Sequence, residues 1–175
     1  MSERVRIEEN EHLLGRRDAE VVLVEYADFQ CPYCRRAHDA LTALRAEHGE
    51  RLALAYRHLP LSHLHPDAQA AAEAAEAAGE AGKFWEMHDA LFANQDRLDA
   101  EALPSMAAAL GMDGERVRAD LEGGRFRARV QEIAEGGRAL GASGTPTIFI
   151  NGERYEGDSD HASLAAAIGK ALDGG

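Results

Sequence analysis

The sequence predicts an α/β protein in which a long all-helical block interrupts alternating strands and helices. Three observations support this class: a strand–helix–strand pattern in the first third of the chain, a middle part without strand character, and a hairpin followed by a helix near the end. With 175 residues, the chain is long enough for one domain with an insertion. We therefore divide it into residues 1–65, 66–141 and 142–175.

The N-terminal elements are a strand, a helix and a second strand. Val21–Ala27 (VVLVEYA) is almost continuously apolar, as in a strand that is buried on both faces. Pro32 suits the first turn of a helix, and apolar residues then recur at helical spacing until Gly49 ends it. Residues 51–57 alternate like a strand, and the proline-containing stretch 58–66 is expected to be a loop.

Periodicity, glycine and proline define the later elements. Helices are expected over residues 66–82, 84–94, 104–111, 113–121 and 126–140. The first of these is rich in alanine, and its periodic glutamates indicate a solvated face. Thr147–Ile150 and residues 153–156 flank an Asn-Gly pair at 151–152, a strong signal for a two-residue hairpin turn. Ser159 or Asp160 can cap a last helix.

Composition disfavours several kinds of partner. The formal net charge of −12 argues against nucleic acid and anionic membranes, because both require a basic surface. No apolar run approaches the ~20 residues of a membrane span. The charged first residues, MSERVRIEENEH, hold no apolar core of a signal peptide, so we expect a cytoplasmic protein unless a signal peptide has been removed.

Both cysteines of the chain lie in one motif, Cys31-Pro32-Tyr33-Cys34. This spacing suits a redox pair, half of a zinc site, or chance. A thiolate attacks a disulfide, and the positive end of a helix favours the anion, so we assign Cys31, at the start of the helix, as the nucleophile. Cys34 lies one turn further and can resolve the mixed disulfide. Pro32 fixes the turn, Tyr33 lines the substrate surface, and no metal or organic cofactor is needed.

Three histidines offer the zinc alternative. His58, His63 and His65 lie in one predicted loop, and two of them could complete a tetrahedral site with the cysteines. The competing interpretation is that they are polar loop residues near the rim of the active site. Of the other candidates, His38 is interpreted as a helix-surface residue and His88 as a hydrogen-bonded histidine of the core.

The order of elements and three motifs resemble the DsbA-like thiol–disulfide oxidoreductases. The motifs are DFQCPYC after the first strand, HP…GKFWEMHDALF in the helical block, and GASGTPTIFING at the hairpin. The resemblance runs from about Leu14 to the C-terminus. It implies a thioredoxin fold, with halves at 1–65 and 142–175 and, at 66–141, an inserted all-helical subdomain with its return helix. CPYC itself is shared with glutaredoxins, which have no room for the helical block.

The resemblance also implies roles for three further residues. The Thr145–Pro146 bond is expected to be cis and to lie opposite the cysteines, with the backbone of Thr145 pairing with a substrate chain. An ordinary trans proline at the start of a strand is the alternative. Glu25 is the one charge in an apolar strand, at the spacing where thioredoxin-like proteins keep an acid. It could exchange a proton with Cys34, or simply pair with a lysine or arginine.

These observations predict an enzyme that exchanges disulfides with protein or small-thiol substrates. Strongly oxidising relatives carry a histidine between the cysteines, whereas this chain has Tyr33, so we expect a reductase or isomerase. Glutathione or a thioredoxin-type protein is the candidate electron donor. The alternative is a zinc- or partner-binding module without redox turnover. Isomerases of the glutathione-transferase kappa kind share the helical insertion but do not use a CxxC pair.

Overall fold

The computed structural model describes residues 4–174 and consists of two compact units. One unit holds the sheet and comprises the described parts of Met1–Ala27, Pro32–Arg57 and Ser143–Gly175. The other is helical and comprises Asp28–Cys31 and His58–Ala142. Among the described residues, no helix has the length and apolar character needed to cross a membrane.

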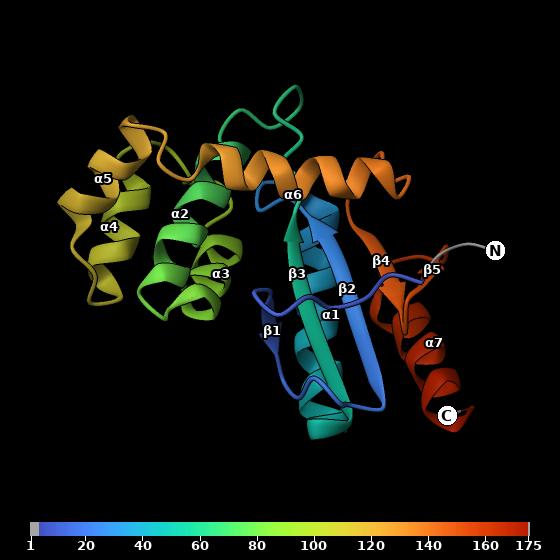
Figure 1. Ribbon diagram of the computed structural model, residues 1–175. Coiled ribbons are helices and arrows are strands. Elements are labelled where there is room, and N and C mark those ends of the chain that lie inside the picture. Colours follow the sequence, from blue (N-terminus) through green and yellow to red (C-terminus); the bar gives the residue numbers. More distant parts are fainter. Residues whose placement is uncertain (1–3, 175) are drawn as a thin grey trace. The chain divides into compact units, whose positions relative to one another are not determined.

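The sheet unit is built on five strands in the order β1-β3-β2-β4-β5 (Figure 1). The strands are β1 (His12–Leu14), β2 (Val21–Ala27), β3 (Leu52–His58), β4 (Thr147–Ile150) and β5 (Glu153–Tyr155). β2 and β4 are antiparallel neighbours, with Glu25 opposite Ile148. The β2–β4 pairing therefore joins the N-terminal and C-terminal parts of the chain in one sheet.

Two long helices complete the sheet unit. α1 (Pro32–His48) and α7 (His161–Asp173) pack against each other, and the 3-10 turn η1 (Gly49–Arg51) follows α1. Their apolar residues at helical spacing are buried, as expected from the sequence: Ala37, Leu41 and Leu44 in α1, and Leu164, Ile168 and Leu172 in α7. Of the two expected caps, Asp160 begins α7, because its side chain accepts the Ser163 N–H at 2.9 Å.

The predicted hairpin turn is confirmed. Asn151 and Gly152 have φ values of 49° and 86°, the left-handed pair that a tight two-residue turn between twisted strands requires. The Asn151 side chain also accepts the Val22 N–H at 2.9 Å, and its backbone N–H donates to the Val22 carbonyl at 3.0 Å. The turn is thus attached to β2 as well as to its own strands.

The helical unit is centred on the alanine-rich helix. Its helices are α2 (Ala68–Glu80), α3 (Phe84–Ala93), α4 (Ala102–Ala109), α5 (Gly114–Glu122) and α6 (Arg127–Ala139). α2 packs against each of the other four, because its small alanine side chains let neighbouring helices approach closely. The prediction of a solvated glutamate face is wrong for Glu73 and Glu76, which are buried. Arg129 of α6 donates to the Glu76 carboxylate at 2.8 Å and balances its charge.

Candidate active site

The two cysteines lie where the turn after β2 enters α1. Cys31 immediately precedes Pro32, the first residue of α1, and Cys34 lies in the first helical turn. Both side chains are buried, with 4% of Cys31 and 0% of Cys34 exposed. Because the first turn of a helix presents N–H groups that lack a partner within the helix, the position of Cys31 favours an anion.

Asp28 organises the turn that precedes Cys31. Its carboxylate accepts hydrogen bonds from the Gln30 N–H at 2.7 Å, from the Leu61 N–H at 2.9 Å and from His65 Nδ1 at 2.8 Å. The Asp28 carbonyl in turn accepts the Cys31 N–H at 3.1 Å. The turn is therefore held by a carboxylate that is itself buried.

The histidines differ from one another in their surroundings. His63 is exposed, as expected for a polar loop residue, and His65 is half-buried beside Asp28. The loop assignment is wrong for His58, which ends β3 and is fully buried, with its ring 6.1 Å from those of Phe29 and Phe84. Phe84, which is itself buried, helps to shield the His58 ring from solvent.

His88 is confirmed as a hydrogen-bonded histidine of the core. Only 3% of it is exposed, and its ring lies 5.1 Å from that of Phe92. Its Nδ1 lies 2.9 Å from an oxygen of Asp89. His38 is half-buried on α1.

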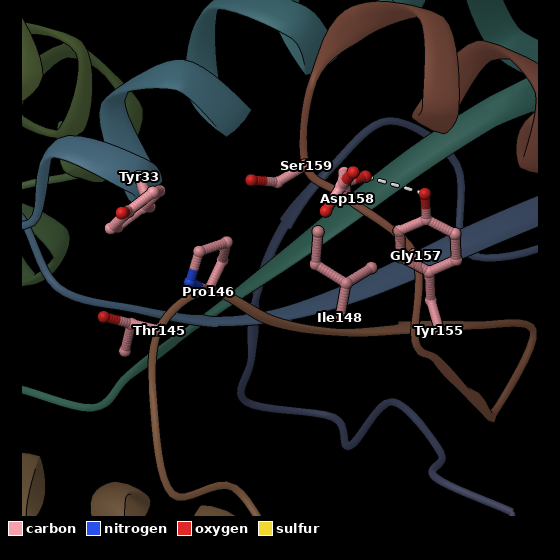
Figure 2. A pocket seen from close by; sticks show the side chains of 8 residues that line it. All are labelled: Tyr33, Thr145, Pro146, Ile148, Tyr155, Gly157, Asp158 and Ser159. Carbon is pink, nitrogen blue, oxygen red and sulfur yellow. Dashed lines mark hydrogen bonds between the residues drawn. The ribbon is translucent and has the colours of Figure 1, made fainter.

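Within the sheet unit, Tyr33 shares a pocket with the loop before β4 (Figure 2). The pocket has a volume of about 170 Å³. Its lining residues are Tyr33, Thr145, Pro146, Ile148, Tyr155, Gly157, Asp158 and Ser159. Tyr33 is 60% exposed, so the CxxC motif presents a large aromatic surface to solvent. The Thr145–Pro146 peptide bond is cis, the isomer that the resemblance implies.

The far wall of the pocket carries negative charge. The Tyr155 hydroxyl donates to the Asp158 carbonyl at 2.7 Å (Figure 2). Burial raises the pKa of Tyr155, and the negative charges of Asp160 and Asp158 raise it further. On the other side, the Arg36 guanidinium lies 5.8 Å from the centre of the Tyr33 ring. The pocket therefore combines an aromatic ring, a proline and an acidic wall.

Glu25 lies in the interior of β2 and is 2% exposed. Its partner across the sheet, Ile148, lines the pocket with Tyr33. The carboxylate is thus buried in the strand that leads to the CxxC motif.

Sequence reasoning identified Tyr33, Thr145 and Pro146, which the structure brings to one pocket. It did not identify Asp28 as the organiser of the turn or Asp158 as part of the pocket wall. Asp28 carried a usable signal, because an aspartate two residues before an N–H in a turn often accepts from that N–H. The stretch EGDSD after the hairpin was a weaker signal of an acidic wall.

A known family covers most of the chain. The sequence profile of the family described as "Thioredoxin" matches residues 8–170. Among curated proteins, the Na⁺/H⁺ antiporter NhaA 1 of Salinispora arenicola is 43% identical over 166 residues. Antiporter NhaA 3 of Salinispora tropica is 44% identical over 164 residues. These matches cover 95% and 94% of this chain but 25% of each antiporter, so the chain spans about a quarter of the length of these relatives.

Several solved structures share the fold. BdbD from Bacillus subtilis, in its oxidised form, has a TM-score of 0.83 at 22% identity and covers 93% of both chains. A thioredoxin-like oxidoreductase from Silicibacter pomeroyi DSS-3 has a TM-score of 0.80 at 28% identity, over 95% of this chain and 94% of that one. α-DsbA1 from Wolbachia pipientis has a TM-score of 0.83 at 18% identity, over 97% and 94%. The chain therefore belongs to the thioredoxin family, and its fold is that of the DsbA-like proteins, a thioredoxin fold with an inserted helical part.

Proposed function

We propose that the chain is a thiol–disulfide oxidoreductase that uses Cys31 and Cys34 as its redox pair. The observation that carries this proposal is the pocket in which Tyr33, between the two cysteines in sequence, meets Thr145 and Pro146. A disulfide held in this pocket would lie next to the CxxC motif. Membership of the thioredoxin family and the likeness to an oxidoreductase at 28% identity support the same activity.

The reaction transfers two electrons from the cysteine pair to a disulfide. The Cys31 thiolate attacks one sulfur of the substrate disulfide, and the other sulfur leaves as a thiolate. Cys34 then attacks the Cys31 sulfur of this mixed disulfide and releases the second substrate thiol. The products are a Cys31–Cys34 disulfide and a reduced substrate, so neither a metal nor an organic cofactor is needed.

Two further residues have roles in this proposal. Glu25 takes the proton of Cys34 during resolution, because a buried carboxylate is a suitable base when its charged form is poorly solvated. The backbone of Thr145, beside Pro146, pairs with an extended segment of the substrate protein. Pro32 fixes the turn between the cysteines.

We propose protein disulfides as the substrates and a reductase or isomerase as the working role. Glutathione or a thioredoxin-type protein would return the electrons to Cys31 and Cys34. The proposed location is the cytoplasm, where glutathione keeps most thiols reduced. Cell fractionation with an antibody against the chain tests this location, and recovery of the protein outside the cytoplasm would contradict it.

Cysteine substitutions test the assignment of roles. Cys31→Ser should abolish the reduction of a protein disulfide such as insulin, because no thiolate remains at the helix start. Cys34→Ser should instead accumulate a mixed disulfide through Cys31, because attack succeeds and resolution does not. Mass spectrometry under non-reducing conditions detects the adduct. An adduct with Cys31→Ser but not with Cys34→Ser would reverse the assignment.

Counting free thiols separates this proposal from the zinc- or partner-binding alternative. After mild oxidation and removal of metal by a chelator, a redox pair loses two thiols per chain and regains both with a reductant. A zinc site would release metal on oxidation and protect the thiols when zinc is added.

The curated relatives favour a second candidate function, in which the chain acts on the thiols of a Na⁺/H⁺ antiporter. In these relatives, about a quarter of an antiporter chain is over 40% identical to this protein. The test compares sodium-dependent proton transport in membrane vesicles supplied with the reduced wild-type chain or with the Cys31→Ser variant. Equal transport with both proteins would rule out this function.

A further inference from the structure

The peptide segment that carries Cys31 is held by an amide from a distant part of the chain. The Nε2 atom of Gln95 donates to the Phe29 carbonyl at 2.9 Å and to the Cys31 carbonyl at 2.7 Å. A side-chain amide nitrogen has two hydrogens, so one group can satisfy both carbonyls at once. Because carbonyl oxygens only accept, it is the nitrogen of Gln95 that faces them.

Gln95 directly follows the C-terminus of α3, and this position places its amide beside residues 28–31. Asn94 closes the C-terminus of α3, and its side chain donates to the Ala90 carbonyl at 2.8 Å. Within the last turn of α3, the ring of Phe92 lies 5.0 Å from the ring of Phe29. The end of α3 therefore contacts the segment twice, through a ring against Phe29 and through the Gln95 amide on its backbone.

Further hydrogen bonds hold the same segment, residues 28–31. Asp28 accepts from Leu61 and His65, and the Gln30 side chain accepts the Asp67 N–H at 2.9 Å. These contacts do not involve Gln95. The segment should therefore remain folded without Gln95, while the carbonyls of Phe29 and Cys31 lose the hydrogen bonds from its amide.

We infer that Gln95 is a positioning residue for Cys31. By holding the carbonyls on both sides of Gln30, it fixes the backbone from which the Cys31 side chain projects at the start of α1. This position is where helix N–H groups favour a thiolate. Gln95 thus acts on the reactivity of the nucleophile through the backbone, without a role as acid or base. The inference rests on the proposed function, since it assumes that Cys31 attacks.

The test measures the reactivity of Cys31 alone. The full chain carries Cys34→Ser, so that Cys31 is the single thiol, and its rate of alkylation by iodoacetamide is followed against pH. We expect Gln95→Ala to slow alkylation roughly three- to tenfold at neutral pH and to move the profile to higher pH. Gln95→Glu should have the larger effect, because a carboxylate would face two carbonyl oxygens and would repel the thiolate.

Gln131→Ala and Gln95→Met serve as the control and the substitute variant. Gln131→Ala removes an exposed amide of α6 in the same unit and should leave the profile unchanged. Gln95→Met keeps the length of the side chain without its donors and replaces Gln95→Ala if that variant does not fold. If Gln95 variants unfold at lower temperature but keep the parent pH profile, Gln95 has a structural role only and the inference is wrong. It is equally wrong if neither property changes.

The proposed function fails in a different experiment. It is contradicted if the wild-type chain reduces no protein disulfide, whatever the Gln95 variants do. If the wild type is active and the Gln95 variants alkylate like their parent, only the positioning role is lost.

Discussion

The negative charge at the wall of the pocket affects the pKa of Tyr155. Its pKa is raised by burial and by the charges of Asp160 and Asp158, which all favour the neutral phenol. A group whose pKa is raised on folding stabilises the folded state below its unfolded pKa and loses that contribution as the pH passes its folded pKa. The stabilisation by Tyr155 is therefore present at neutral pH and is lost at a pH above about 10.

Removing one of these charges should lower the pKa of Tyr155 toward its usual value. Asp158→Asn removes a charge and keeps the backbone carbonyl that accepts the Tyr155 hydroxyl. An alkaline titration followed by tyrosinate absorbance, with Tyr155→Phe subtracted, isolates the titration of this residue. Glu156→Gln makes the same change in net charge in the same loop and serves as the control. An unchanged titration in Asp158→Asn would show that its charge does not act on Tyr155.

At the scale of residues, the sequence predicts a site well where its members are neighbours in the chain or carry a rare type. Cys31 and Cys34 are the only cysteines, and Pro146 follows a recognisable loop. Gln95 lies 64 residues from Cys31, one of the two residues whose carbonyls it binds, and glutamine is common on protein surfaces. A contact of this kind depends on tertiary structure, so periodicity and motifs do not reveal it.

At the scale of elements, Arg57 joins the strands of the N-terminal half. From β3, its guanidinium donates to the Glu11 carboxylate next to β1, to the Tyr26 hydroxyl of β2 at 2.8 Å and to the Arg6 carbonyl at 2.7 Å. The side chains of Arg57 and Glu11 are each 13% exposed, so water screens their pairing little. This pair therefore fastens the N-terminal segment to the sheet.

Breaking this pair should destabilise the protein. Glu11→Gln leaves a mostly buried guanidinium without its counter-charge, and we expect the free energy of unfolding to fall by about 1–3 kcal/mol. Urea unfolding measures the change. The control is Glu153→Gln, which breaks an ion pair with Arg4 whose side chains are 72% and 70% exposed. Its expected effect is below about 1 kcal/mol, and equal effects in both variants would refute the argument.

The elements themselves were predictable to different degrees. β2 and the hairpin follow from a buried apolar run and from Asn-Gly, signals that act locally. β1 was not predicted, because His12–Leu14 is too short to show alternation and becomes a strand by pairing with β3. The buried Glu76 was assigned to a solvated face because nothing in an alanine-rich stretch reveals that helices surround it on several sides.

At the scale of the whole molecule, the order of elements predicted the α/β class, and the resemblance to the DsbA-like family implied the thioredoxin fold. A CxxC motif between a buried strand and a helix, a long helical block and a terminal hairpin and helix together fit few architectures. The length of the relatives cannot be predicted in the same way. The curated relatives are about four times as long as their match to this chain, and no residue pattern within the chain reports what a longer relative contains.

The direction of electron flow is also a property of the whole chain, and the reduction potential measures it. The potentials of thiol–disulfide proteins run from about −270 mV for thioredoxin to about −120 mV for DsbA. A strong oxidant needs a highly stabilised thiolate, and Tyr33 offers no cation between the cysteines. Arg36, just after the first turn of α1, lies over the Tyr33 ring and adds some positive charge near the start of this helix, whose first turn has no acidic residue. We expect a potential of roughly −180 to −270 mV, typical of a reductase or isomerase.

Equilibration with glutathione buffers, followed by alkylation of the remaining thiols, gives this potential. Tyr33→His supplies the missing partial charge and should make the potential more positive by about 30 mV or more, which corresponds to ~1.4 kcal/mol for a two-electron couple. Tyr33→Phe keeps the aromatic ring without a charge and should stay within about 10 mV of the wild type on the same scale. A wild-type value near −120 mV would contradict the proposed direction. It would mean that other groups stabilise the Cys31 thiolate strongly enough for the chain to act as an oxidase.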